Sequence, residues 1–294
     1  MLNWGTEMPK FRGNVFGGHC SQGRLKRLPN PQILLSKGIN QALPFIEYRI
    51  IFSGIKATLI IPKSWNGALI IQIPGFRGHR NAPGRVNFAR KYLAANSFAS
   101  LRFDFTDNTS MPSLREVSGR HMEELKRVLE CALANIKPAS IALYGNCLAA
   151  NLALEIAADP MYSSRIKAVI ALSPFGIPHE FAVESALLQK EMQADRRRNI
   201  LAKIGIDASP EFMAELVAAN MAGNVAKIPE TTPVLFLVGN HDPLTGPIAV
   251  RPLFEAKKGR KEYVEFPGRS HGYINPQESR IVDESALAFL KTSL

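Results

Sequence analysis

The chain has 294 residues, of which 46% are hydrophobic and 21% are charged. These values fit one large domain, or a domain with an inserted subdomain, and they exclude a wholly disordered chain. The 21 glycines and 20 prolines are too few for a collagen or a low-complexity protein. No stretch approaches ~20 unbroken apolar residues, so the sequence predicts no membrane-spanning helix.

The formal net charge of +11 raises the question of a nucleic-acid or anionic-membrane partner. The basic residues are dispersed, however, with local runs only at residues 196–198 and 257–261. We therefore interpret them as solvated surface charge and expect no nucleic-acid partner, with an anionic small substrate as the alternative. The three cysteines, Cys20, Cys131 and Cys147, lie far apart, which matches neither disulfides nor zinc and suits a reducing, cytoplasmic location.

Residues 1–44 are expected to form an irregular arm over the domain surface. They contain many Gly, Pro and basic residues, and Glu7 is their only acidic residue. They have no apolar core of the kind that a secretory signal needs. From Phe45 the pattern changes, since β-rich runs at 45–52 and 55–61 are separated by Ser53-Gly54, which predicts a hairpin.

Short apolar runs then alternate with helical segments. We expect strands at residues 68–73, 98–103, 140–144, 166–172, 233–238 and 262–266. Apolar runs bounded by Gly, Pro or polar residues are typical of strands buried on both faces. Helical spacing of apolar residues predicts a helix over residues 116–137, another directly after Cys147 and a last one over residues 284–290. Strands that alternate with helices predict an α/β protein with a doubly wound, mostly parallel sheet.

The interval between Pro174 and Pro229 breaks this alternation. It has helical character and no convincing strand, and structureless loops of that length are uncommon in compact domains. We expect a helical cap that is inserted after one strand and lies over the carboxyl end of the sheet. The predicted organisation is therefore an arm (1–44), a core (45–174 and 230–294) and a cap (175–229).

Cys147 occupies the most informative position in the sequence. It lies in a G-x-C-x-A turn at residues 145–149, between a predicted strand and a predicted helix. A nucleophile on such a sharp turn needs small residues two before and two after it, and the start of the helix favours a thiolate. A buried structural cysteine is the competing interpretation. Cys131, on the apolar side of its helix, is expected in the core.

Two other strands end in residues that could cooperate with this cysteine. Asp242 follows the strand at 233–238, and His271 follows the strand at 262–266. Taken singly, a turn aspartate and a structural histidine are the simpler interpretations. Nucleophile, acid and histidine nevertheless follow one another in the order of a known catalytic triad, each at a strand end, where open α/β sheets bind ligands.

The loop after the strand at 68–73 supports this interpretation. It contains glycines on both sides of Phe76, whose main-chain N–H could bind an oxyanion together with the N–H of Leu148. Arg77 and Arg80 lie beside this loop. Either could bind a substrate carboxylate, although exposed loop arginines are the simpler interpretation.

From about Phe45 to its C-terminus, the chain resembles the α/β-hydrolase superfamily. The loop PGFRG (74–78) and the segment LRFDF (101–105) are similar to those of bacterial cinnamoyl/feruloyl esterases, and the cysteine nucleophile is similar to that of dienelactone hydrolase. The chain departs from these esterases at Pro74, where they usually have His, and at residues 107–109, where they have a Gly-His-Gly run. The resemblance implies that Cys147 is the nucleophile, His271 the base and Asp242 the residue that orients it.

The predicted activity is acyl hydrolysis through an acyl-thioester enzyme. Because a thiolate is a better leaving group than an amine, esters, lactones and thioesters are favoured over amides as the small-molecule substrate. The alternatives are an acyltransferase or cyclase that uses the same intermediate, and a non-catalytic receptor on the same scaffold. The sequence contains no recognisable cofactor or metal motif, and this mechanism requires neither.

Overall fold

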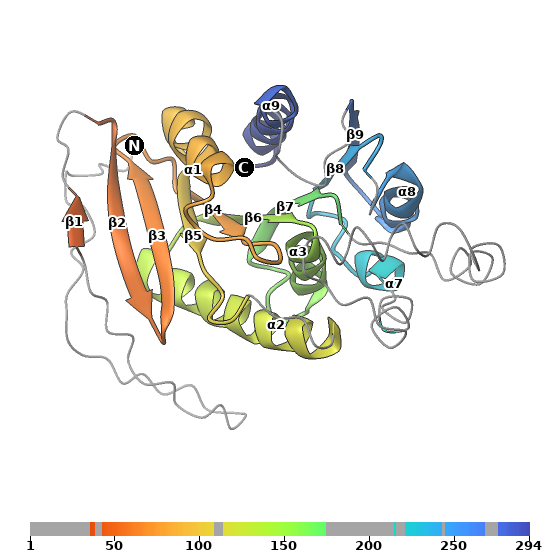
Figure 1. Cartoon of the computed structure of the whole chain (residues 1–294), viewed down its shortest axis with the longest axis horizontal. Coiled ribbons are helices and arrows are strands. Elements are labelled where there is room, and N and C mark those ends of the chain that lie inside the picture. Colours follow the sequence, from red (N-terminus) through yellow and green to blue (C-terminus); the bar gives the residue numbers. More distant parts are fainter. Residues whose placement is uncertain are drawn as a thin grey trace.

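One sheet runs through the whole described part of the chain. The computed structural model describes residues 36–38, 43–108, 114–174, 215, 221–242, 245–267 and 276–294. In these residues the strands follow the order β1-β2-β3-β5-β4-β6-β7-β8-β9 (Figure 1). The strands are β1 (Ser36–Gly38), β2 (Phe45–Phe52), β3 (Ile55–Pro62), β4 (Ala68–Ile73), β5 (Ala99–Phe103), β6 (Ser140–Asn146), β7 (Ile166–Leu172), β8 (Val234–Gly239) and β9 (Lys261–Phe266).

From β5 to β9 in this order, each strand is parallel to the next. The pairs β1–β2, β2–β3 and β3–β5 are antiparallel, and β2 and β3 form the predicted hairpin. All six residues of β4 and all six of β8 are buried, as expected for strands covered on both faces. The prediction of a doubly wound, mostly parallel sheet is therefore confirmed.

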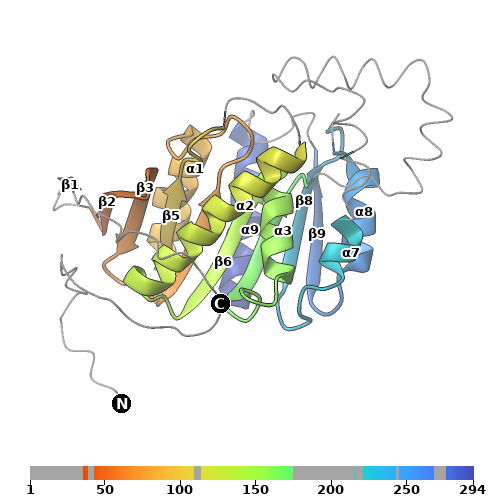
Figure 2. The same cartoon turned by 90° about the horizontal axis from the view of Figure 1, so that it is seen from below.

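Helices cover both faces of the sheet, as Figure 2 shows. One face carries α2 (Leu114–Cys131), α3 (Leu148–Ala158), α7 (Met221–Val225) and α8 (Pro247–Ala256), whereas the other carries α1 (Pro83–Asn87) and α9 (Pro276–Ser293). The helix predicted over 116–137 is confirmed, with a π-helical last turn at Ala132–Ile136. The last helix begins at Pro276, earlier than predicted. Its first two turns are mostly polar and lack the apolar repeat on which the prediction depended. The sequence did not indicate α8, a short helix with Pro252 inside it.

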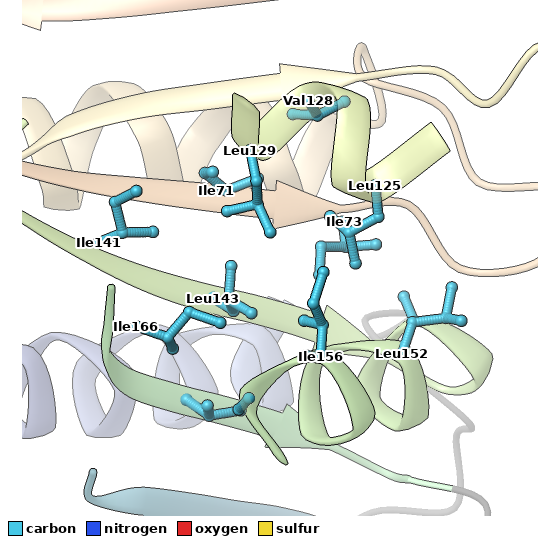
Figure 3. Close-up of a cluster of buried hydrophobic side chains, with 14 of the residues drawn as sticks. Ile71, Ile73, Leu125, Val128, Leu129, Ile141, Leu143, Leu152, Ile156 and Ile166 are labelled. Atoms are coloured by element: carbon cyan, nitrogen blue, oxygen red, sulfur yellow. The ribbon is translucent and has the colours of Figure 1, made fainter. Parts of the chain in front are cut away.

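The larger part of the core lies between the sheet and the pair α2 and α3. Side chains from both helices interdigitate with those of β4, β6 and β7 (Figure 3). Leu125, Leu143 and Ile156, each from a different element, are completely buried at 0% exposure. This packing fixes the end of β6 and the start of α3 relative to β4, which matters for the site described below.

The predicted division into arm, core and cap remains a prediction. Ser36–Gly38 forms β1 on β2 within the segment expected as an arm, and residues 1–35 and 39–42 lie outside the described residues. In the interval expected as a cap, α7 contributes the buried Met221 and Val225 to the core. Residues 175–214 and 216–220 also lie outside the described residues. Across the part of the chain that the structure describes, every helix is too short or too polar to cross a bilayer.

A buried carboxyl group lies where α9 packs near α1. Asp283 is only 1% exposed, and burial raises its pKa to about 7, against the opposing effect of a hydrogen bond from Asn87. Below that pH the folded protein keeps this group neutral, whereas the unfolded chain ionises it above its ordinary pKa of 3.8. Ionisation in the unfolded chain therefore lowers the free energy of unfolding progressively between pH 3.8 and about pH 7. Above that range the loss of stability stays constant.

We expect Asp283→Asn to stabilise the protein at pH 8, by at most about 4 kcal/mol, and to change its stability little at pH 4. Thermal unfolding of both proteins at the two pH values measures the difference. Glu284→Gln, on the exposed side of the same helix, is the matched control and should not show this pH dependence. An equal effect of Asp283→Asn at pH 4 and pH 8 would contradict the prediction.

Candidate active site

Cys147 lies at a strained turn between β6 and α3. The strand ends at Asn146, the helix begins at Leu148, and Cys147 between them has φ 60° and ψ −129°. Residues other than glycine rarely adopt such a positive φ. Backbone strain of this kind is often found at functional sites. The Cys147 N–H donates to the Leu172 carbonyl at the end of β7, at 2.9 Å. The side chain is 7% exposed, so it lies just beneath the rim of the sheet.

Gly145 permits this turn because the chain passes very close to it. A Cβ atom at Gly145 would lie 2.1 Å from the Ala149 carbonyl oxygen and 2.6 Å from the Ala150 nitrogen. Both of these are main-chain atoms, which cannot move away without distorting the start of α3. Ala149 itself is fully buried at 0% exposure. The small residues at both positions are therefore a requirement of the turn, as the sequence analysis expected.

The connection after β4 lies against this turn. A Cβ atom at Gly75 would lie 2.9 Å from the Asn146 carbonyl oxygen and 3.8 Å from the Cys147 Cβ atom. Residues Gly75 and Gly78 close a β-turn, in which the Gly78 N–H donates to the Gly75 carbonyl at 2.8 Å. This turn carries Phe76, the residue expected to bind an oxyanion through its N–H group.

The main-chain N–H groups of Phe76 and Leu148 are both available for hydrogen bonding. Neither donates a hydrogen bond to another group among the described residues. Leu148 is the first residue of α3, where N–H groups have no partner within the helix. One donor lies in the loop that touches Cys147 and the other in the residue that follows it. Their role as an oxyanion site remains a prediction.

Asn108, which the sequence analysis noted only as a departure from the esterases, holds the β4 connection in place. Its side-chain Nδ2 donates to the carbonyls of Gly75 and Gly78, each at 2.9 Å. The main-chain carbonyl of Asn108 accepts a hydrogen bond from the Arg77 N–H at 3.2 Å. The residue is 8% exposed and lies shortly after the end of β5. Its place after a strand end was the one signal in the sequence that could have identified it.

Arg77 and Arg80 have different environments. The Arg80 N–H donates to the Asp104 carboxylate at 2.6 Å, and its guanidinium pairs with the same carboxylate. Arg102 also donates to the Arg80 carbonyl at 2.7 Å. Arg80 is therefore a structural support for the connection. Arg77, by contrast, is exposed, and its guanidinium lies 5.8 Å from the centre of the Phe76 ring.

Asp242 follows β8 and is held by Thr245. The Thr245 N–H donates to Asp242 Oδ1 at 3.1 Å, and its hydroxyl donates to Oδ2 at 2.9 Å. Asp242 is 6% exposed and Thr245 is fully buried at 0%. Hydrogen bonds to both oxygens fix the orientation of the carboxylate. The spacing Asp-x-x-Thr was the available signal for Thr245, which the sequence analysis did not identify.

Cys147 follows β6 and Asp242 follows β8, and these two strands lie on either side of β7 in the sheet. The turn of Cys147 is bonded to Leu172, the last residue of β7, and the next residue is Ser173. The Ser173 carbonyl lies 3.4 Å from the Thr245 hydroxyl. Ser173 itself has a positive φ of 45° and is fully buried at 0% exposure. The end of β7 therefore links the cysteine turn to the loop that carries the carboxylate.

His271 lies outside the described residues, so its predicted role as base remains a prediction. β9, which precedes it, ends at Phe266 and is parallel to β8. The Asn240 N–H donates to the Phe266 carbonyl at 3.0 Å, which joins the ends of the two strands. The chain therefore leaves β9 at the rim where Asp242 lies.

Cys131 and His121 also have potentially reactive side chains, but the contacts of both are structural. Cys131 packs against the core, and burial raises its pKa to about 11, so it stays a thiol. His121 is 1% exposed and stacks on Phe105 with 3.8 Å between the ring centres. Burial lowers the His121 pKa, so its neutral ring can donate from Nε2 to the Asp107 carbonyl at 2.9 Å. Within the described residues, no cluster of His, Cys, Asp and Glu is arranged to hold a metal ion.

Comparison with known proteins shows an α/β-hydrolase fold. No family model matches the sequence, and no curated protein matches it. Solved structures, however, match over most of both chains. Est1E from Butyrivibrio proteoclasticus is 20% identical, with a TM-score of 0.60 over 84% of this chain and 98% of its own. An acetyl xylan esterase from Paenibacillus is 16% identical, with a TM-score of 0.62 over 91% and 90% of the two chains.

A dienelactone hydrolase from Anabaena variabilis is also similar. It is 16% identical, with a TM-score of 0.58 over 90% of this chain and 99% of its own. At these identities the likeness concerns the fold. The predicted α/β-hydrolase fold is therefore confirmed, and function has to be argued from the site.

We expect Gly145→Ala to destabilise the protein severely, by about 3 kcal/mol or more, because the new Cβ would overlap main-chain atoms of α3. Gly119→Ala is a matched control, since nothing lies within 4 Å of a Cβ at this position in α2. That control should be neutral or stabilising by up to about 1 kcal/mol, as alanine favours helix. Denaturant unfolding of the two variants measures both effects, and equal stability of both would contradict the close approach at Gly145.

Proposed function

We propose that this protein is an acyl hydrolase that acts on carboxylic esters, lactones or thioesters through Cys147, His271 and Asp242. The observation that carries the proposal is the position of Cys147. It has a positive φ of 60° at the junction of β6 and α3. The β4 connection, with the unused N–H of Phe76, lies against it, and the unused N–H of Leu148 follows it. A merely structural cysteine needs neither the strained turn nor the two N–H groups beside it.

The buried carboxylate of Asp242 supports the same proposal. Two hydrogen bonds from Thr245 fix its orientation at the rim where the chain leaves β9. A fixed carboxylate can select one tautomer of a histidine and stabilise its protonated form. Known esterases among the structural neighbours, including Est1E, which has been solved with bound ferulic acid, agree with an ester substrate.

The proposed reaction has two steps. The Cys147 thiolate attacks the acyl carbon, the carbonyl electron pair moves to oxygen, and the N–H groups of Phe76 and Leu148 bind the resulting oxyanion. When the intermediate collapses, the bond to the alcohol or thiol breaks, and protonated His271 supplies the leaving group with a proton. Water then attacks the acyl-thioester while His271 accepts its proton, and collapse releases the carboxylic acid and the Cys147 thiolate.

The nucleophile determines the class of substrate. A thiolate is a good leaving group, so the intermediate formed with an amide would expel the thiolate in preference to the amine. Esters, lactones and thioesters have leaving groups that compete with the thiolate. Activated acyl compounds are therefore the proposed substrates, and peptides are not.

We expect mass spectrometry of the intact protein, incubated with a panel of acyl esters and thioesters, to detect a covalent acyl adduct on Cys147. Cys147→Ala should abolish the adduct and lower the turnover by about 10⁴-fold or more, as removal of a triad residue does. Cys131→Ala is the matched control, because the raised pKa of about 11 keeps that thiol protonated. Near-normal turnover by Cys147→Ala, or no acylation by any member of the panel, would reject the proposed function.

Thr245 is proposed to act through Asp242 as a positioning residue. We expect Thr245→Val to lower kcat/KM by about 10-fold, the contribution of one hydrogen bond to a charged group. With Asp242 less firmly held, the histidine cation is less stabilised, so His271 loses its proton more readily and the limb of the pH profile that reports this loss should move to lower pH. Thr245→Ser, which keeps the hydroxyl, should restore the profile. A loss of stability in Thr245→Val without any change in the pH profile would assign Thr245 a structural role only.

A further inference from the structure

One long segment beside the candidate site is free of acidic residues. Between Glu47 and Asp104 the chain contains no Asp or Glu. Its basic residues are Arg49, Lys56, Lys63, Arg77, Arg80, Arg85, Arg90, Lys91 and Arg102. The segment includes the β4 connection, which packs against Cys147 through Gly75, and all of α1.

The acidic residues at the two ends of this segment do not neutralise it. Glu47 pairs with Arg90 at 2.6 Å, and Asp104 pairs with Arg80. The basic residues also lie near one another in the fold. Burial lowers the pKa of Arg102 to about 10, against the effect of Glu47, and Arg90, Arg80 and Arg85 lower it further. Positive charge thus remains in excess at this side of the site.

Arg77 is the basic residue of this segment that lies nearest to Cys147 along the loop. It is exposed, and within the described part of the chain its side chain makes no ion pair. Asp107 precedes Asn108, whose main-chain carbonyl accepts the Arg77 N–H, and Arg120 lies 3.3 Å from the Asp107 carboxylate. The Arg77 guanidinium can therefore bind an external anion without first breaking an internal pair.

The backbone at Arg77 provides a second, independent observation. Its φ is +57°, in the left-handed region that favours glycine. Arginine at this position is therefore less favourable for the turn than glycine. The turn between Gly75 and Gly78 would form at least as well with a third glycine, so the fold alone does not account for this side chain.

We propose that Arg77 determines substrate specificity by binding an anionic group, a carboxylate or a phosphate, on the acyl ester or thioester that acylates Cys147. The inference rests on the proposed function and narrows it to one class of substrate. The planar guanidinium can form two parallel hydrogen bonds with either group. The anion can belong to the acyl part or to the leaving alcohol or thiol, and the two sources can be separated by experiment.

The test uses two matched pairs of substrates. Mono-p-nitrophenyl glutarate and p-nitrophenyl pentanoate differ in a charge on the acyl part, and butyryl-coenzyme A and S-butyryl-N-acetylcysteamine differ in charge on the thiol part. For each pair the measured quantity is the ratio of kcat/KM for the anionic and the neutral substrate, after subtraction of the buffer rate. We expect Arg77→Gln to lower this ratio by about 10-fold or more for one pair, as loss of one charge-assisted hydrogen bond does.

Arg49→Gln is the matched control. It removes the same charge from an exposed residue of β2, with β3 and β5 between that strand and β4. This control should leave both ratios within about two-fold of the original protein, because exposed charges at that distance are screened by salt. Unchanged ratios in Arg77→Gln, or an equal fall in Arg49→Gln, would overturn the proposal. Failure of the original protein to react with any of the four substrates would instead reject the proposed function.

Arg77→Gly separates specificity from folding. Because glycine suits the left-handed backbone, this variant should be at least as stable as the original protein in thermal unfolding. It should nevertheless show the same loss of preference for the anionic substrate as Arg77→Gln. A variant that unfolds at a lower temperature and keeps the original ratio would show that Arg77 supports the turn, and would overturn the proposal.

Discussion

The candidate site depends on the close approach of two main-chain segments at Gly145. The carbonyl of Ala149 lies so near that a Cβ at Gly145 would be only 2.1 Å from its oxygen. This approach bends the chain sharply between β6 and α3 and leaves Cys147 with a positive φ. The strain is maintained because both elements belong to the main core, where the side chains of α3 pack against the sheet.

Two polar contacts extend this arrangement along the rim of the sheet. Asn108 binds the turn after β4 through both of its Nδ2 hydrogens, and Thr245 binds both oxygens of Asp242. Each of these side chains is buried, where an unmade hydrogen bond would be costly. Loops at the carboxyl ends of parallel strands thereby gain a rigidity that short loops on a surface do not have by themselves.

The distribution of charge is the basis of the proposed specificity. Arg80 and Arg77 are only three residues apart, yet the first supports the loop through Asp104 and the second reaches solvent from a backbone that favours glycine. A net charge of +11 dispersed over the chain says little about a partner. The same charge becomes informative where a segment without acidic residues borders the candidate nucleophile.

The sequence by itself determined the alternation of strands and helices and the turn at Cys147, because these depend on residues close together in the chain: buried apolar runs, a 3.6-residue repeat, and small residues at positions 145 and 149. Only the tertiary structure revealed Asn108 and Thr245, whose partners Gly75 and Ser173 lie 33 and 72 residues away. It also placed α8, whose short apolar pattern contains Pro252. Contacts between distant strand ends follow from the order of the strands in the sheet, and no local pattern of residues encodes that order.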